Sequence, residues 1–210
     1  MTRWLNTQAR RVPEWAVWLG GALPLGLLIF DTLRQRLGVD PVAAIEHRLG
    51  RTAIYFLIAS LAVTPLLRLA KVNLVPLRRA LGLLAFGYVV LHITAWVVID
   101  MGLRWEQLLR DIVKRPYLLF GAGAALILLA LALTSSAAAI RRMGGSAWKR
   151  LHRLVYVAAV LTSLHWLSVG KVWHPEAKFW GFVVLVLLGV RLLPRGFGSR
   201  RGGNKSVAIQ

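Results

Sequence analysis

Apolar residues run along the chain in six long blocks separated by short polar segments. Each block is close to the roughly 20 residues that an α-helix needs to cross the hydrocarbon core of a bilayer. No block alternates as a barrel strand does, and a helix satisfies its own backbone in lipid. The pattern predicts an all-α integral membrane six-helix bundle. The predicted spans are Trp15–Leu33, Thr52–Leu69, Ala80–Ile99, Tyr117–Ala138, Leu151–Val169 and Ala177–Leu193.

The composition supports this class. Of the 210 residues, 57% are hydrophobic, which is outside the usual range of soluble domains. The first apolar block lacks a small-residue cleavage site, so we interpret it as a retained span and not as a signal peptide. The predicted organisation is a cytoplasmic N-terminal segment (1–14), one transmembrane domain (15–193) and a basic, flexible cytoplasmic tail (194–210).

Charge gives the predicted orientation. The formal net charge of +19 would suit a nucleic-acid binder, but the Lys and Arg residues lie in short clusters between the apolar blocks, which excludes nucleic acid in favour of membrane topology. With six alternating spans, the side of the membrane that holds both termini has 17 of the 27 Lys and Arg residues and one of the eight acids. The positive-inside rule therefore predicts a multi-pass protein with both termini in the cytoplasm.

Among the residue types that bind metals, histidine is the main candidate in the predicted spans. The chain has no cysteine, which excludes disulfides, iron–sulfur clusters and covalently attached c-type haem. Three of the five histidines, His92, His152 and His165, lie within or at the edge of predicted spans. A single membrane histidine often does no more than hydrogen-bond a neighbouring helix. Three in two spans favour a functional site, since ionisable groups are costly to bury in lipid.

The depth of two histidines indicates a shared ligand. The third and fifth spans run in the same direction, with His92 twelve residues beyond Ala80 and His165 fourteen beyond Leu151. These spacings correspond to roughly 18 and 21 Å along the helix axes, so the two imidazoles can face each other. Two imidazoles in a dry apolar bundle suit the iron of haem b, whereas zinc would need further ligands. The predicted iron ligands of this outward haem are His92 and His165.

His152 indicates a second site nearer the cytoplasmic face. It lies roughly 20 Å before His165 on a straight helix. Where a matching ligand would be expected on the third span stands Arg78, whose guanidinium is a poor iron ligand but a good partner for a haem propionate. Thirteen residues also place His152 roughly 140° from His165 around an ideal helix. Either the helix bends or the two sites lie on different sides of it.

Other polar residues have two interpretations each. The cations Arg79, Lys149 and Arg150 could pair with propionates together with Arg78, or could reflect the positive-inside bias alone. His47 is predicted in the first outward loop, in a short amphipathic stretch that could line a quinone or partner site. His174 is predicted to be a solvated loop residue.

Four stretches together resemble a known family. In this order and spacing they are similar to the haem-binding membrane subunits of the bacterial protein-methionine-sulfoxide reductase system, which belong to the ferric-reductase-like transmembrane group. The similarity covers about Val12 to Arg191. The stretches are DPVAAIEHRLGRTA (Asp40–Ala53), RRALGLLAFGYVVLH (Arg78–His92), KRPYLLFG (Lys114–Gly121) and WKRLHRLVYVAAVLTSLHWL (Trp148–Leu167).

The resemblance implies a function. It implies a b-type cytochrome with one or two haems per chain, ligated by His92, His152 and His165, that relays electrons without substrate chemistry of its own. The donor would be the quinone pool or a flavin reductase. The acceptor would be a molybdopterin methionine-sulfoxide reductase in the periplasm, across the bacterial inner membrane. FMN is also associated with the family, although the chain has no phosphate-binding glycine motif.

Three other functions fit a histidine-containing membrane bundle. A stand-alone ferric or cupric reductase would use the same scaffold, but normally with a flavin and nicotinamide domain. A transporter or proton channel would use the histidines as relays. A purely structural membrane scaffold would not need them. If the haem relay is correct, the outward loops with His47, Arg115 and Tyr117 are the predicted docking surface for the periplasmic partner.

Overall fold

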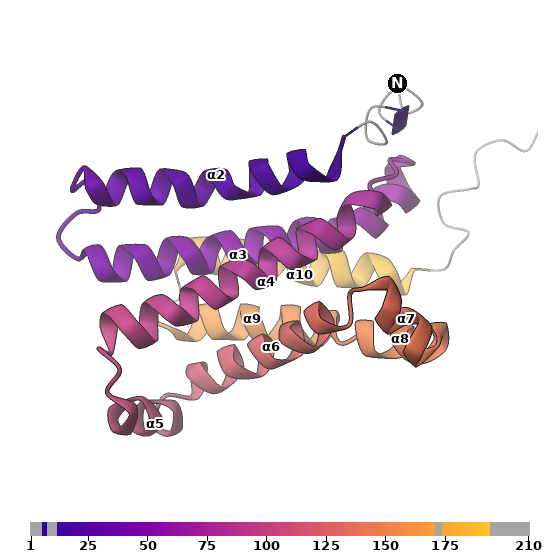
Figure 1. The fold of residues 1–210 in the computed structure, drawn as a ribbon. Helices are drawn as coiled ribbons and strands as arrows, with labels where there is room; N and C mark the ends of the chain where they lie inside the picture. The colour runs from indigo at the N-terminus through magenta and orange to yellow at the C-terminus, as the bar shows by residue number, and fades with distance from the viewer. Residues whose placement is uncertain (1–5, 8–11, 171–173, 194–210) are drawn as a thin grey trace, which may run out of the picture.

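The computed structural model describes residues 6–7, 12–170 and 174–193, and the described chain is helical without β-strands. Six long helices, α2, α3, α4, α6, α9 and α10, lie side by side (Figure 1). The predicted tail 194–210, and most of the predicted segment 1–14, lie outside the described residues. The α-helices are α2 (Glu14–Leu33), α3 (Pro41–Pro65), α4 (Arg78–Thr94), α5 (Trp105–Lys114), α6 (Pro116–Leu133), α7 (Ala137–Met143), α8 (Gly145–His152), α9 (Val155–Ser168) and α10 (Pro175–Leu192).

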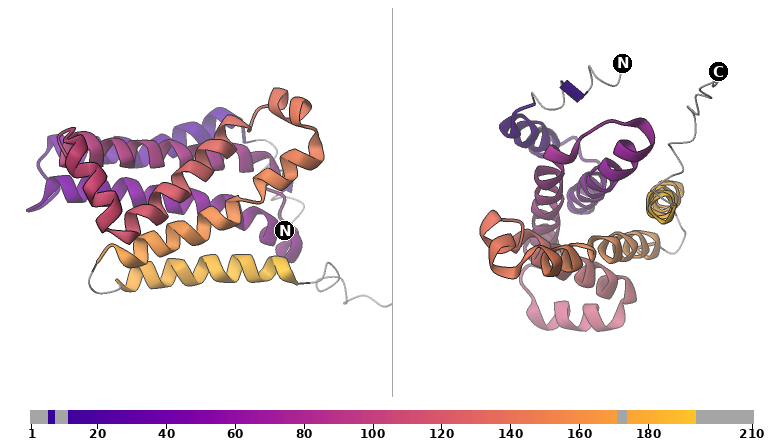
Figure 2. Two further views of the ribbon diagram at one scale, coloured as in Figure 1. Left: turned by 90° about the horizontal axis from the view of Figure 1, so that it is seen from below. Right: turned by 90° about the vertical axis from the view of Figure 1, so that its right-hand side faces the viewer.

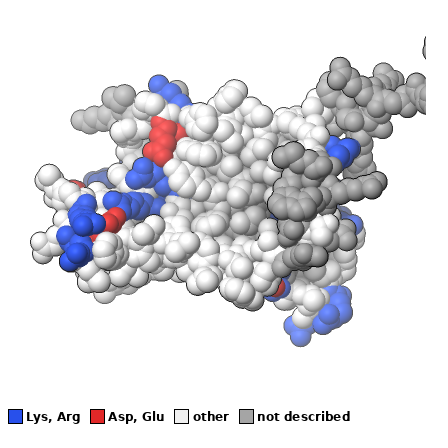
Figure 3. Space-filling view, turned by 90° about the horizontal axis from the view of Figure 1, so that it is seen from above, with Lys and Arg blue, Asp and Glu red and all other residues white. Residues whose placement is uncertain are grey.

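The two ends of the bundle hold different segments of the chain. The start of α2 and the end of α10 lie at one end, which we call the termini end (Figure 1). The short helix α5 lies at the other, which we call the α5 end. Charged side chains gather toward both ends and leave an apolar band between them (Figure 3). This distribution is that of a protein whose middle is solvated by lipid.

The all-α prediction is confirmed, and the structure qualifies the number of spans. By length and composition, four helical segments among the described residues are able to cross a membrane: Glu14–Leu33, Pro41–Ala70, Val75–Asp100 and Pro116–Leu133. The fifth predicted block is shorter as a helix, because α9 has 14 residues. The sixth, α10, has 18 residues, but three of them are charged.

The first outward segment is helical, contrary to the predicted loop. Helix α3 begins at Pro41, eleven residues before the predicted span. The Asp40 side chain accepts a hydrogen bond from the backbone N–H of Ala43 at 3.0 Å, and proline is favoured at the first helical position. The segment is amphipathic, so a search for long apolar blocks did not detect that the helix begins here. His47 therefore lies on the exposed face of a helix and not in a loop.

The fifth predicted span is broken near its start. Helix α8 ends at His152, and α9 begins at Val155. In the turn between them, the N–H groups of Arg153 and Leu154 bond to carbonyls three residues back, at 3.2 and 2.9 Å. This turn puts His152, the last residue of α8, and His165 of α9 on separate helices.

Helix α3 lies at the centre of the packing. It packs against α4 and α10, while α6 packs against α9. The core between these helices includes Leu57, Leu61, Ala85, Ala158 and Val184, all almost completely buried. In the end-on view of Figure 2, α2 and α10 lie on the outside of the bundle. The space between α4 and α9 is thus flanked by α3 and α6.

Candidate functional site

The structure brings His92 of α4 and His165 of α9 together. Their ring centroids are 6.3 Å apart, with the ring planes at 75°. A metal bound by two imidazole nitrogens at about 2 Å each separates the ring centres by roughly 6 Å. The two side chains are therefore spaced for one shared metal ion without movement of the helices.

Both imidazoles are held by backbone carbonyls of neighbouring helices. The Nδ1 of His92 lies 3.0 Å from the carbonyl oxygen of Glu46 on α3, and the Nδ1 of His165 lies 2.8 Å from that of Tyr117 on α6. A carbonyl only accepts hydrogen bonds, so each Nδ1 has the proton and donates it. The lone pair of each neutral ring is then on Nε2, the nitrogen that a metal would take.

A glycine four residues after each carbonyl makes room for the ring. In an α-helix the side chain at position i+4 lies beside the carbonyl of residue i. Gly50 follows Glu46, and Gly121 follows Tyr117, at this spacing. A Cβ at Gly121 would lie 2.8 Å from Nδ1 of His165, and a Cβ at Gly50 would lie 3.4 Å from Nδ1 of His92. We call each carbonyl with its glycine a histidine notch.

His152 lies apart from this pair. It is the last residue of α8, its ring stacks on Trp148 with centroids 4.1 Å apart, and its Nε2 is 3.1 Å from the hydroxyl oxygen of Thr134. That hydroxyl donates its proton to the carbonyl of Ala130 at 2.7 Å. His152 Nε2 is therefore the donor to Thr134, and its lone pair is on Nδ1. This tautomer is opposite to that of His92 and His165.

Arg78 lies near His152 but offers no second ligand. It is the first residue of α4, and its charge acts on the imidazole of His152. Among the described residues, no cluster of three or more His, Asp and Glu side chains could hold a metal ion. The three further cations predicted for propionates, Arg79, Lys149 and Arg150, are exposed.

Arg191 is a residue that sequence reasoning missed as part of a site. It lies in the last turn of α10, yet its side chain reaches into the bundle. Its Nη1 donates to the Tyr156 hydroxyl at 2.6 Å and its Nη2 to the carbonyl of Leu61 at 2.7 Å. The signal was present, because an arginine inside a predicted span is by itself a reason to suspect function.

Of the three residues predicted for a partner surface, two are exposed and the third, Tyr117, contacts the histidine pair. His47 on α3 and Arg115, just before α6, are exposed. The Arg115 guanidinium donates to the Tyr117 hydroxyl at 3.1 Å, while the carbonyl of Tyr117 holds His165. Tyr117 thus joins the surface of the α5 end to the histidine pair. His174 is exposed at the start of α10, as predicted.

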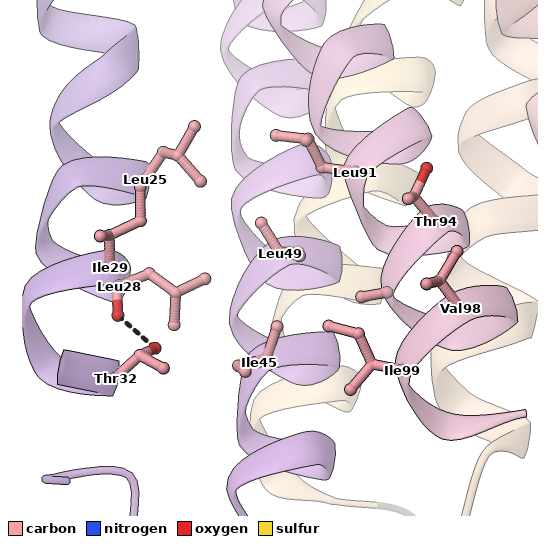
Figure 4. Close-up of a pocket in the computed structure, with 11 residues that line it drawn as sticks. Leu25, Leu28, Ile29, Thr32, Ile45, Leu49, Leu91, Thr94, Val98 and Ile99 are labelled. Atoms are coloured by element: carbon pink, nitrogen blue, oxygen red, sulfur yellow. Dashed lines mark hydrogen bonds between the residues drawn. The ribbon is translucent and has the colours of Figure 1, made fainter. Parts of the chain in front are cut away.

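An apolar groove on the other side of α4 is not the histidine site. It lies between α2, α3 and the segment from α4 into the following π-helical turn (Figure 4). The Thr32 hydroxyl in it already donates to the carbonyl of Leu28, at 2.7 Å. No imidazole or carboxylate lines it. The lining residues are Leu25, Leu28, Ile29, Thr32, Ile45, Leu49, Leu91, Thr94, Ala95, Val98 and Ile99.

The middle of the chain matches a known protein family. The family of ferric reductase like transmembrane components matches residues 49–163, so the chain contains a ferric-reductase-like transmembrane domain. The match includes His92 and His152 and ends two residues before His165. No solved structure matches the chain significantly.

Full-length relatives define the family more closely. Proteins named protein-methionine-sulfoxide reductase heme-binding subunit MsrQ are similar over most of the chain. The protein of Herminiimonas arsenicoxydans is 41% identical over 84% of this chain and 82% of its own length. That of Ralstonia nicotianae is 38% identical over 98% and 96%, and that of Brucella ovis 38% over 89% and 87%. The chain belongs to the MsrQ family.

Proposed function

We propose that this protein is a b-type cytochrome subunit that relays electrons across the membrane and has no substrate chemistry of its own. The observation that supports this best is the histidine pair with both Nε2 lone pairs left free by the notches. A pair that served proton relay would not need both rings fixed in the same tautomer at the spacing of a shared metal. The names of the relatives, heme-binding subunits, agree with this proposal.

The residues present fit haem b at the pair. His92 and His165 would ligate the iron, which supplies one-electron chemistry when bound. The carbonyls of Glu46 and Tyr117 accept the Nδ1–H of His92 and His165. These hydrogen bonds hold the orientations of the two rings and make their imidazoles more basic as ligands. For His152 the fit is weaker, since its Nε2 is engaged by the Thr134 hydroxyl.

The partners follow from the family. We propose that electrons pass to a molybdopterin methionine-sulfoxide reductase in the periplasm, and that the donor is the quinone pool or a flavin reductase. In this arrangement the termini end faces the cytoplasm of the inner membrane, and the α5 end, with Arg115 and His47, faces the partner. The excess of Lys and Arg at the termini end supports the orientation. FMN remains a proposal from family resemblance alone.

The first test is a visible spectrum of the purified protein. We expect an intense Soret band and, on reduction, the sharp α-band of low-spin haem with two imidazole ligands. A histidine-relay transporter would show neither band. Reduced protein reoxidised by ferric citrate alone, as fast as by the purified reductase partner, would favour the ferric reductase function instead.

His152→Ala is expected to leave the haem of the pair in place. His152 lies on a different helix from His165 and contacts Thr134 and Trp148 instead of the pair. Haem content and the low-spin signal should therefore remain at the level of one haem per chain. Thr134→Val, which removes the hydroxyl but keeps the side-chain shape, is the matched control. A folded His152→Ala protein without any haem would contradict the assignment.

A further inference from the structure

One nitrogen of the Arg191 guanidinium has no acceptor. Two of its nitrogens bond to neutral oxygens, the Tyr156 hydroxyl and the Leu61 carbonyl. The third, Nε, is buried and without a hydrogen-bond partner among the described residues. A buried donor left unpaired costs about 1–3 kcal/mol, and more when the group is charged. The free N–H indicates an acceptor that comes from outside the described chain.

The direction of the side chain is unusual for a membrane arginine. Arg191 stands in the last turn of α10, where its guanidinium could extend outward to the headgroup region. Instead it reaches Leu61, which is 0% exposed and lies nine residues, or roughly 13 Å, before the end of the helical segment at Ala70. The charge is thus drawn into the bundle, where it is harder to solvate.

The surrounding charges are of the same sign. The two ionised groups that act on the Arg191 guanidinium are Arg78 and Arg68, and an Nη of Arg68 also donates to the Arg191 carbonyl at 3.4 Å. Every described Asp and Glu except Glu14 belongs to the segments of the α5 end. None of the salt bridges of the described residues includes these three arginines. The Arg191 guanidinium also lies over the Tyr156 ring, with its carbon 4.7 Å from the ring centroid, so its described neighbours are an aromatic face, neutral oxygens and other cations.

We infer that Arg191, with Arg78 and Arg68, forms a binding site for an oxyanion in the termini half of the bundle. The ligand chemistry is a carboxylate or phosphate that accepts the Nε–H of Arg191 and is attached to an apolar body able to lie between helices. Two sources offer it: a propionate of a haem bound near His152, or the phosphate of a phospholipid from the adjoining leaflet. The propionate source rests on the proposed function, whereas the phospholipid source does not.

The test compares Arg191→Gln with a control at an exposed arginine of α7, Arg142→Gln, in detergent-purified protein. Haem per chain and tightly bound phospholipid per chain are counted by absorbance and by native mass spectrometry. We expect Arg191→Gln to retain one of these ligands about 10- to 100-fold more weakly, and the control to retain both. Loss of haem down to one per chain identifies the propionate. Loss of a bound phosphatidylglycerol with unchanged haem identifies the phospholipid.

Two outcomes would overturn the inference. Arg191→Gln that keeps every ligand of the wild type would show that the guanidinium only links α10 to α3 and α9. Wild-type protein with a single haem and no retained phospholipid would also refute it, and this measurement needs no variant that might misfold. Neither outcome touches the proposed function, which fails only if the haem of His92 and His165 is absent.

Discussion

His92→Ala and His165→Ala are each expected to abolish the low-spin haem signal of the same site. The two rings face each other at 6.3 Å, so either substitution leaves the iron with one axial ligand. Haem content should fall by the same amount in both variants, and any haem that remains at this site should be high-spin. Absorbance and electron paramagnetic resonance of the purified variants measure both quantities.

Equal effects are the decisive result for the pairing. A variant that kept a full bis-histidine signal after loss of either side chain would show that the other ligand comes from elsewhere. Imidazole added to the medium should restore six-coordination in both alanine variants, since each substitution opens a cavity at the ligand position. His174→Ala, which changes an exposed histidine at the start of α10, is the control for general effects on folding.

Gly121→Ala is expected to have the second largest effect, although it changes no ligand. A Cβ there would lie 2.8 Å from Nδ1 and 3.0 Å from Cε1 of His165, so the ring must move away from the Tyr117 carbonyl. Loss of this outer hydrogen bond typically weakens metal binding about 10- to 100-fold. We expect correspondingly weaker haem retention and a higher midpoint potential in the haem that remains, since the ligand becomes less basic.

Matched glycines separate this effect from ordinary helix stabilisation. Gly87→Ala on α4 adds the same methyl group where nothing lies within 4 Å, and should leave haem unchanged. Gly50→Ala, with its Cβ 3.4 Å from the His92 ring, should give a smaller shift than Gly121→Ala. An unchanged potential in Gly121→Ala protein, measured by redox titration, would show that the notch does not position His165.

Hydropathy and spacing predicted the helices and the shared depth of His92 and His165, because both depend on the rise of a helix in lipid. The same reasoning could not find the notches. A hydrogen bond to a backbone carbonyl depends on the fold and requires no particular residue type, so the sequence does not reveal it. The spacing of His152 and His165 left open whether the helix bends or the two sites lie on different sides of it. The break after His152 depends on local turn geometry that the apolar pattern does not encode.

Two further features were missed, each for its own reason. The start of α3 at Pro41 was hidden because its first turns are amphipathic, and hydropathy detects only the lipid-facing part of a helix. Arg191 was counted with the cytoplasmic charges because sequence position places it near a span end. Only the fold shows that its side chain turns inward to Tyr156 and Leu61.

The two notches also lie in separate pairs of packed helices, α3 with α4 and α6 with α9. His92 is held by α3, the helix that precedes its own in the chain, and His165 is held by α6, the helix against which α9 packs. Each ligand is thus oriented within its own helix pair. A haem held by both histidines would therefore link the two helix pairs across the bundle.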